Sequence, residues 1–251
     1  MDTIKSPSDF GSGIGNAIIF SAGLGTRFRP WTEKHPKALA VINGKSLLQR
    51  NIQYLQQYGI TNVIVNVHHF ANQIIDAIHK NKGWGSQITI SDESDEVLET
   101  GGGLLKARHL FKNETFLALN VDILTDANIK SFVAHHQQEN ALITLATTNR
   151  KTTRYLLFNK YNRLCGWRNT ASGEEKIVLK AKDIFEKAYS GMAIFEPNVF
   201  DLISFTGKFS LIDVYLSLAH DNKISSFDHS ESSIIDVGKP ESVELAEKMF
   251  P

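Results

Sequence analysis

The sequence has a single cysteine, Cys165, among its 251 residues. One cysteine cannot form an intrachain disulfide, which excludes the disulfide-rich class of secreted domains and favours a reducing cytoplasm. No run approaches the ~20 consecutive apolar residues that cross a bilayer. Residues 1–16 also lack the cationic start and apolar stretch of a secretory signal. The sequence therefore predicts a cytoplasmic protein that does not bind membranes.

An excess of charge of either sign is also absent. The 27 lysines and arginines balance the 27 aspartates and glutamates, so the formal net charge is zero. This balance argues against a general nucleic-acid or membrane-surface binder, because such proteins carry basic patches that bind phosphates. An anionic small molecule would have to be bound by a local cluster of cations.

Apolar runs and helical patterns alternate through the first half of the chain. We expect strands at residues 16–21, 62–67, 87–90, 116–121 and 141–147, and helices at residues 46–58, 71–80, 103–111 and 128–138. Repeated strand–helix–strand units indicate an α/β fold. The prediction is a doubly wound, mostly parallel mixed sheet with helices on both faces.

The pattern changes in the second half. We expect a hairpin from residues 155–159 and 163–167, a mobile loop at residues 170–182, strands at 189–195 and 232–237, and helices at 211–219 and 240–249. Residues 1–15 are polar and glycine-rich, so they are expected to form a disordered extension. Residues 16–251 are predicted to form one domain.

A glycine-rich loop follows the first strand, so it should lie at the carboxyl edge of the sheet, where open α/β folds bind ligands. Gly23 and Gly25 allow the backbone to approach a phosphate and to offer N–H donors. Arg27 and Lys37 add positive charge suited to phosphate oxygens. Together these residues predict a triphosphate site.

Two other glycine-rich phosphate motifs do not fit this loop. A P-loop ends in Gly-Lys-Ser/Thr, but Gly25 is followed by Thr26 and Arg27. The dinucleotide-binding motif needs a third glycine at the position of Phe28.

The loop resembles the signature of the sugar-phosphate nucleotidyltransferases, also called nucleotide-sugar pyrophosphorylases. The matching residues are Gly23, Gly25, Thr26, Arg27, Pro30, Thr32, Pro36 and Lys37. The resemblance implies a Rossmann-like fold, with residues 16–150 binding the nucleotide and residues 151–251 the sugar phosphate. The nucleotide-binding residues it implies are Ala22, Gly23, Gly25, Thr26, Arg27, Lys37, Thr100 and Gly101.

Two aspartates are candidate ligands for Mg²⁺, which proteins bind through one or two carboxylates plus substrate phosphates. Asp122 and Asp236 each end a predicted strand. The family carries an aspartate at both places, the second in an Asp-Val-Gly stretch that matches here. Valine replaces the family's usual glycine before Asp122. The resemblance therefore implies that Arg27, Lys37 and Asp122 are catalytic, and that Asp122 and Asp236 bind Mg²⁺.

Residues 98–103 are expected to contact base and sugar ahead of a helix, because three glycines permit close packing of a ligand. The Glu-Thr-Gly-Gly-Gly sequence looks most like that of N-acetylmuramate 1-phosphate uridylyltransferases. Guanylyltransferases acting on mannose or heptose phosphates usually have Gly-Thr instead of Glu99-Thr100. Where many relatives have a base-reading glutamine, Glu93, Ser94 or Asp95 stands here.

The family also contacts the sugar phosphate through a Ser/Thr-Gly pair and a lysine. Ser190 and Gly191 resemble the pair, and Arg168 is a candidate to replace the missing lysine. The residues expected to bind the sugar phosphate are Glu99, Gly102, Asn120, Arg168, Ser190 and Gly191.

The predicted enzyme joins a nucleoside triphosphate to a sugar 1-phosphate with Mg²⁺, as a monomer or homodimer. UTP with N-acetylmuramate 1-phosphate is the first expectation, and mannose or heptose 1-phosphate with GTP is the alternative. Two alternatives come from other classes: a non-catalytic regulatory subunit that binds nucleotide sugars, and a metal-dependent glycosyltransferase. The resemblance extends from about residue 16 to the last residue, so no β-helix or acyltransferase module is expected.

Overall fold

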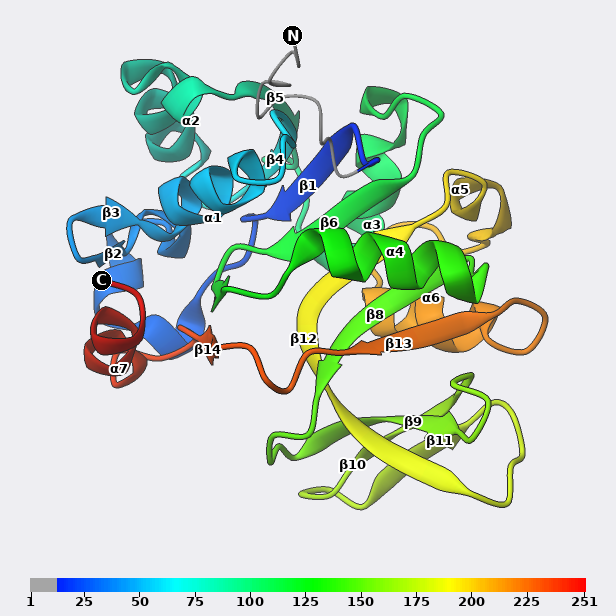
Figure 1. Cartoon of the computed structure of the whole chain (residues 1–251). Coiled ribbons are helices and arrows are strands. Elements are labelled where there is room, and N and C mark those ends of the chain that lie inside the picture. Colours follow the sequence, from blue (N-terminus) through cyan, green and yellow to red (C-terminus); the bar gives the residue numbers. More distant parts are fainter. Residues whose placement is uncertain (1–12) are drawn as a thin grey trace, which may run out of the picture.

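The computed structural model describes residues 13–251 (Figure 1). Its central ten-stranded sheet has four adjacent parallel strands, in the order β6-β1-β4-β5. These strands are β1 (Asn16–Phe20), β4 (Asn62–Val67), β5 (Gln87–Asp92) and β6 (Phe116–Asn120). The predicted mixed sheet with a parallel core is therefore confirmed.

The second half of the chain completes this sheet with antiparallel strands. The long strand β12 (Ile184–Phe195) pairs with β6, with β8 (Ile143–Thr148) and with β9 (Arg154–Asn159). At one end β12 is part of the main sheet, and at the other it joins a small hairpin sheet (Figure 1). Strand β13 (Ile224–Asp228), which the sequence pattern did not reveal, adds to β8 in parallel.

The small hairpin sheet corrects one prediction. Strand β10 (Leu164–Asn169) pairs with β9 as expected, but residues 170–182 are not simply a loop. They contain β11 (Glu174–Ile177), which pairs with β10 in an antiparallel arrangement. All four β11 residues are exposed, so its polar sequence gave no apolar alternation from which a strand could be read.

Helices cover both faces of the sheet and enclose two separate hydrophobic cores. Side chains alternate along β1, so Ala17 and Ile19 enter one core while Ile18 and Phe20 enter the other. Helices packed on the first core are α1 (Leu47–Gln56), α2 (Ala71–Lys80), α4 (Ile129–Glu139) and α7 (Ser242–Met249). Helices packed on the second core are α3 (Glu99–Lys106), α5 (Val199–Leu202) and α6 (Leu211–Leu218).

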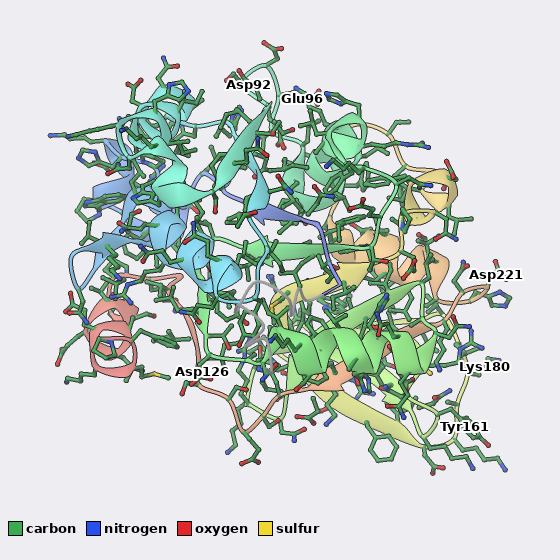
Figure 2. All side chains as sticks on the ribbon, turned by 45° about the horizontal axis from the view of Figure 1, so that its top comes forward. Asp92, Glu96, Asp126, Tyr161, Lys180 and Asp221 are labelled. Carbon is green, nitrogen blue, oxygen red and sulfur yellow. The ribbon has the colours of Figure 1, made fainter. Side chains whose placement is uncertain are left out.

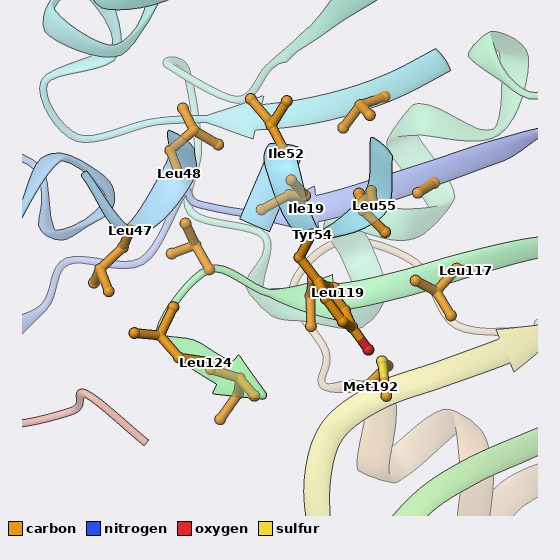
Figure 3. Close-up of a cluster of buried hydrophobic side chains, with 14 of the residues drawn as sticks. Ile19, Leu47, Leu48, Ile52, Tyr54, Leu55, Leu117, Leu119, Leu124 and Met192 are labelled. Atoms are coloured by element: carbon orange, nitrogen blue, oxygen red, sulfur yellow. The ribbon is translucent and has the colours of Figure 1, made fainter. Parts of the chain in front are cut away.

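Figure 3 shows part of the first core, where Ile52 and Leu55 of α1 lie over Ile19 of β1.

The short elements are β2 (Val41–Ile42), β3 (Lys45–Ser46), β7 (Ile123–Thr125), β14 (Ile234–Asp236) and the 3-10 turns η2 (Thr26–Phe28), η3 (Trp31–Glu33), η4 (Lys37–Leu39), η5 (Lys82–Gly85) and η6 (Ala107–Leu110).

Most of the expected N-terminal extension, residues 1–12, lies outside the described residues. Ile14, within the predicted range of residues 1–15, is 4% exposed and packs in the first core. Within residues 13–251, no helix is long and apolar enough to cross a membrane. The two expected halves share one sheet, because β12 of the second pairs with β6 of the first.

The register of the parallel strands determines where the functional residues meet. Phe20, the last residue of β1, pairs with Asn66 of β4 on one side and with Asn120 of β6 on the other. The segments that leave these strands therefore begin at the same edge of the sheet. This carboxyl edge is the expected ligand-binding edge of an open α/β sheet.

Candidate active site

The glycine loop after β1 is fixed by contacts within itself. Gly25 has a left-handed backbone conformation, with φ of +60°. A Cβ there would lie 2.9 Å from Cγ2 of Thr32, so a larger residue would clash as well as strain the backbone. The Thr32 hydroxyl donates to the Gly25 carbonyl at 2.9 Å. Phe28 anchors the next turn in the core at 4% exposure.

A cavity of about 510 Å³ opens beside this loop. This volume is within the range typical of small-molecule sites. Its lining residues are Phe20, Ser21, Ala22, Gly23, Leu24, Gly25, Thr26, Arg27, Lys37, Asn66, Glu93, Val97, Glu99, Thr100, Asn120, Val121, Asp122, Lys208 and Gly238. A Cβ on Gly23 would meet no atom within 4 Å, so the bare backbone of Gly23 leaves room for a ligand. Seven of the eight residues expected to bind the nucleotide line the cavity; Gly101 does not.

Asn66 joins the loop to the neighbouring strand. Its side-chain oxygen accepts hydrogen bonds from the backbone N–H groups of Ser21 at 2.6 Å and Ala22 at 3.3 Å. Its amide group donates to Oε1 of Glu93 at 2.8 Å. Asn66 is buried, and the sequence analysis did not single it out. The available signal was a polar residue inside the otherwise β-branched run of β4.

One end of the cavity combines cations with carboxylates. Nζ of Lys37 lies 2.6 Å from Oδ2 of Asp122, and both side chains are largely shielded from solvent. Strand β14 pairs with β7, and the Val237 N–H donates to the Asp122 carbonyl at 2.8 Å. Asp236 is thereby placed next to Asp122. The two predicted carboxylates, from distant parts of the sequence, meet at one point.

The electrostatic surroundings of Asp236 show how closely these groups gather. Loss of hydration and the nearby Asp122 carboxylate raise the pKa of Asp236, while the charges of Lys37, Arg27 and Arg150 oppose that rise. A Cβ on Gly238 would lie 2.7 Å from Oδ1 of Asp236 and 3.3 Å from Nη2 of Arg27. A side chain at this position would displace the ends of both of these side chains.

The donor set fits a magnesium ion held jointly by protein and substrate. Two carboxylates that repel each other would both be stabilised by a dication, and carboxylate and phosphate oxygens are ligands that Mg²⁺ prefers. Within residues 13–251, no group of three or more histidines, cysteines or acids forms a complete metal cage. Asp122 and Asp236 would therefore share the ion with substrate phosphates and water.

Asn51 supports Asp122 from behind. It is buried in α1 and donates from Nδ2 to the Val121 carbonyl at 2.9 Å and to the Leu47 carbonyl at 3.0 Å. The backbone that precedes Asp122 is thus fixed to a helix of the first core. Valine in place of the family's usual glycine is accommodated there, because Val121 is 6% exposed and packs in that core.

The cavity lining also contains a buried acid. Glu93 is 1% exposed, whereas Asp92 and Glu96 nearby in the sequence lie at the surface (Figure 2). Burial raises the pKa of Glu93, and the Asn66 hydrogen bond partly offsets this rise. Its second oxygen, Oε2, has no hydrogen-bond partner among the described residues. A buried polar atom without a partner is costly, which makes Glu93 a candidate functional residue of the cavity.

The three glycines of α3 pack closely against other parts of the chain. The helix begins at Glu99, so the glycines lie inside it rather than ahead of it. A Cβ on Gly101 would lie 2.5 Å from the Phe209 ring, and one on Gly102 would lie 2.4 Å from the Gly207 carbonyl oxygen. These glycines let protein segments pack closely, so neither lines the cavity.

Residues at the mouth of the cavity include one that sequence reasoning missed. Glu99 and Thr100 line the cavity as expected, and Asn120 lines it at the end of β6. Lys208, from the loop before α6, also lines it, and its Nζ lies 3.6 Å from Oε1 of Glu99. No motif surrounds Lys208, so only the folded chain places this cation at the site.

Four of the six residues expected to bind the sugar phosphate lie outside the cavity lining: Gly102, described above, and Arg168, Ser190 and Gly191. Gly191 packs against Asn120, and Ser190 is buried with its hydroxyl 2.7 Å from Nε2 of His229. Arg168 is on β10 of the hairpin sheet, where its guanidinium pairs with Glu175 and Glu186. The structure therefore brings Ser190 and Gly191 next to a lining residue, but it does not bring Arg168 to the cavity.

Comparison with known proteins agrees with this geometry. The family described as Nucleotidyl transferase matches residues 16–248. The chain is 28% identical to N-acetylmuramate alpha-1-phosphate uridylyltransferase from Caulobacter vibrioides, over 92% of this chain and 95% of that relative. It is also 28% identical to mannose-1-phosphate guanyltransferase from Schizosaccharomyces pombe, over 89% of this chain and 61% of that relative. With two other curated relatives the match covers only about half of the relative's own length, 50% and 53%.

The fold itself matches a solved structure of HddC from Yersinia pseudotuberculosis complexed with GMP-PN. The TM-score is 0.78 at 22% sequence identity, and the match covers 95% of this chain and 100% of the other. The family match spans nearly all of the described residues, including the glycine loop and both aspartates. The chain belongs to the nucleotidyl transferase family, which confirms the predicted resemblance.

Proposed function

We propose that the chain is an enzyme that joins a nucleoside triphosphate to a sugar 1-phosphate and releases pyrophosphate. The observation that carries this proposal is the cluster of Arg27, Lys37, Asp122 and Asp236 beside the glycine loop. A triphosphate is bound by accessible backbone N–H groups and by positive charge, which the glycine loop with Arg27 and Lys37 provides. The family match independently supports the same class of reaction.

In this reaction an oxygen of the sugar phosphate attacks the α-phosphorus, and the bond from that phosphorus to the pyrophosphate oxygen breaks. The attacking phosphate is already ionised near pH 7, so no general base is required. The work of the protein is therefore to align the two phosphates and to neutralise their charge. Lys37 and Arg27 stabilise the departing pyrophosphate. Bound Mg²⁺ would supply further charge neutralisation at Asp122 and Asp236.

For the substrates we propose UTP and N-acetylmuramate 1-phosphate. Two observations support this choice: the sequence at residues 98–103, and the likeness to the Caulobacter uridylyltransferase along nearly its whole length. Glu93 is the residue that would meet the base, because it lines the cavity, stands where many relatives have a base-reading glutamine, and has an unpartnered Oε2. A protonated carboxyl has one donor and one acceptor, as the edge of uracil requires.

A second candidate nucleotide, GTP, is favoured if Glu93 is ionised. A carboxylate only accepts hydrogen bonds, and guanine presents two adjacent N–H donors, whereas the carbonyl oxygens of uracil would be repelled. Burial raises the pKa of Glu93, so the protonated form persists to higher pH than in an ordinary glutamate. The ratio of kcat/KM for UTP to that for GTP should therefore fall as pH rises through this raised pKa.

The Glu93→Gln variant tests which base Glu93 selects. An amide keeps one donor and one acceptor, so we expect UTP use to persist and its pH dependence to flatten. GTP use should fall roughly 10- to 100-fold, because a hydrogen bond to a charged group is lost. The measurement is kcat/KM for each triphosphate between pH 5.5 and 9, with Glu96→Gln as the surface control. Loss of UTP use with retention of GTP use would contradict the choice of uracil.

The activity itself is tested by a panel of triphosphates and sugar 1-phosphates with Mg²⁺, in an assay of pyrophosphate release. Pyrophosphate release that requires both substrates supports the proposed function. Binding of nucleotide sugar without turnover would instead indicate the regulatory subunit considered above. We further propose that the enzyme works in the cytoplasm, where both substrates would be available, as a monomer or homodimer.

A further inference from the structure

The sugar phosphate needs its own cation, and the obvious candidates are already neutralised. Arg168 is held between the carboxylates of Glu175 and Glu186. Lys187, on β12, pairs with Asp228 and donates to Oδ1 of Asn149 at 2.8 Å. Neither side chain can bind a phosphate without giving up an existing ion pair. Of the cations that line the cavity, Arg27 and Lys37 would serve the triphosphate, and Lys208 lies 3.6 Å from the Glu99 carboxylate.

Arg150 differs from these residues. It lies just after β8, and its Nη2 donates to the Tyr189 carbonyl at 2.9 Å. Within residues 13–251, its exposed guanidinium forms no ion pair with a carboxylate. One hydrogen bond to a neutral carbonyl leaves most of its five donors free. Arg150 is thus an anchored but uncompensated positive charge.

The strand that anchors Arg150 contacts a residue of the cavity wall. The partner strand β12 has an irregular register between Tyr189 and Ala193, and Gly191 within it has φ of +71° and packs against Asn120. Irregularities of this kind often lie next to active sites. Arg150 is not among the residues that line the cavity, but the Tyr189 carbonyl that anchors it lies two residues from Gly191, which packs against the lining residue Asn120.

We propose that Arg150 binds the phosphate of the sugar 1-phosphate, beside the cavity wall at Asn120. The proposal rests on the proposed function. A guanidinium offers two parallel N–H donors to two phosphate oxygens, and its fixation by the Tyr189 carbonyl reduces the entropy lost on binding. Tyr189, Ser190 and Gly191 follow one another in β12, so one strand holds Arg150, His229 and Asn120 in place.

Kinetic analysis of Arg150→Ala tests this role. At saturating triphosphate we expect the KM for the sugar 1-phosphate to rise roughly 10- to 100-fold, as for loss of a hydrogen-bonded charge, with an unchanged KM for the triphosphate. For Arg150→Lys we expect a KM for the sugar 1-phosphate between those of the unmodified protein and Arg150→Ala, because an ammonium keeps the charge but not the paired donors. The exposed Arg154→Ala is the matched control, and Arg168→Ala tests the rival assignment.

Two results would overturn the proposal: an unchanged KM for the sugar 1-phosphate in Arg150→Ala, or an equal rise in both KM values, which would indicate a structural role. Calorimetric binding of N-acetylmuramate 1-phosphate and glucose 1-phosphate gives a readout that does not depend on turnover. Weaker binding in Arg150→Ala than in Arg154→Ala supports the proposal, and equal binding contradicts it. If the unmodified protein released no pyrophosphate with any pair of substrates, the proposed function would fail, while calorimetry would still test Arg150.

Discussion

Replacing Asp122 with asparagine is expected to lower kcat for pyrophosphate release by at least about 10²- to 10³-fold, because a charged group aimed at the reacting phosphates is lost. Asparagine keeps the size of the side chain, and the Asp122 carbonyl keeps its bond from the Val237 N–H. The fold should therefore persist. The change removes one of two carboxylates for Mg²⁺ and leaves Lys37 without its ion partner.

The measurement is steady-state turnover at increasing Mg²⁺, with thermal unfolding as a check on folding. Asp122→Asn should need more Mg²⁺ for half-maximal activity, because fewer carboxylates hold the ion. Asp76→Asn, an exposed change on α2, is the matched control and should behave like the unmodified protein. Near-native turnover of Asp122→Asn at ordinary Mg²⁺ would show that this carboxylate does not hold the metal.

The second large effect is expected for Lys37→Met. Methionine preserves the length of the buried stem but removes the ammonium group beside Asp122. Two carboxylates then face each other with less compensation, and the pKa of Asp236 should rise further, since Lys37 opposes that rise. We expect kcat/KM for the triphosphate to fall roughly 10²- to 10³-fold, because an electrostatic contact to the departing pyrophosphate is lost.

A matched variant separates this local effect from a general loss of charge. Lys34 lies three residues earlier in the same loop and is exposed, so Lys34→Met should retain its activity. Lys37→Arg should recover little of the lost activity, because the longer, planar group does not fit the space of a compact ammonium. Equal kcat/KM values for Lys37→Met and Lys34→Met would remove Lys37 from the phosphate site.

Short sequence patterns correctly predicted the helices and strands whose apolar spacing is regular. The β-branched run of β4 and the amphipathic α2 have the predicted bounds, because each has a clear period and a clear end. Strand β13 was missed because its sequence, Ile-Ser-Ser-Phe-Asp, has little apolar alternation. Its two serines are buried only because β8 and its neighbours cover them. Pairing with β8, which is distant in the sequence, makes this segment a strand, and its own sequence carries no such signal.

At the candidate site, too, contiguous motifs could be read from the sequence and contacts between distant residues could not. The glycine loop and the two aspartates were predicted because their motifs are contiguous, and the structure places Asp122 beside Asp236. The contact between Asn66 and Glu93 joins residues 27 positions apart, and no short motif records it. The glycines of α3 were assigned to ligand contact, yet their neighbours are Phe209 and Gly207. A glycine in a sequence indicates that another group can pack closely against the backbone, but it does not identify whether that group is a ligand or another part of the protein.

The most direct test of the central claim is the fate of the α-phosphate. The chain should be incubated with Mg²⁺, a sugar 1-phosphate and a nucleoside triphosphate labelled at the α-phosphorus. We expect the label to enter a nucleotide sugar while unlabelled pyrophosphate forms in equal amount. A chain that leaves the labelled triphosphate intact and instead transfers sugar from a ready-made nucleotide sugar would contradict it, and would support the glycosyltransferase alternative.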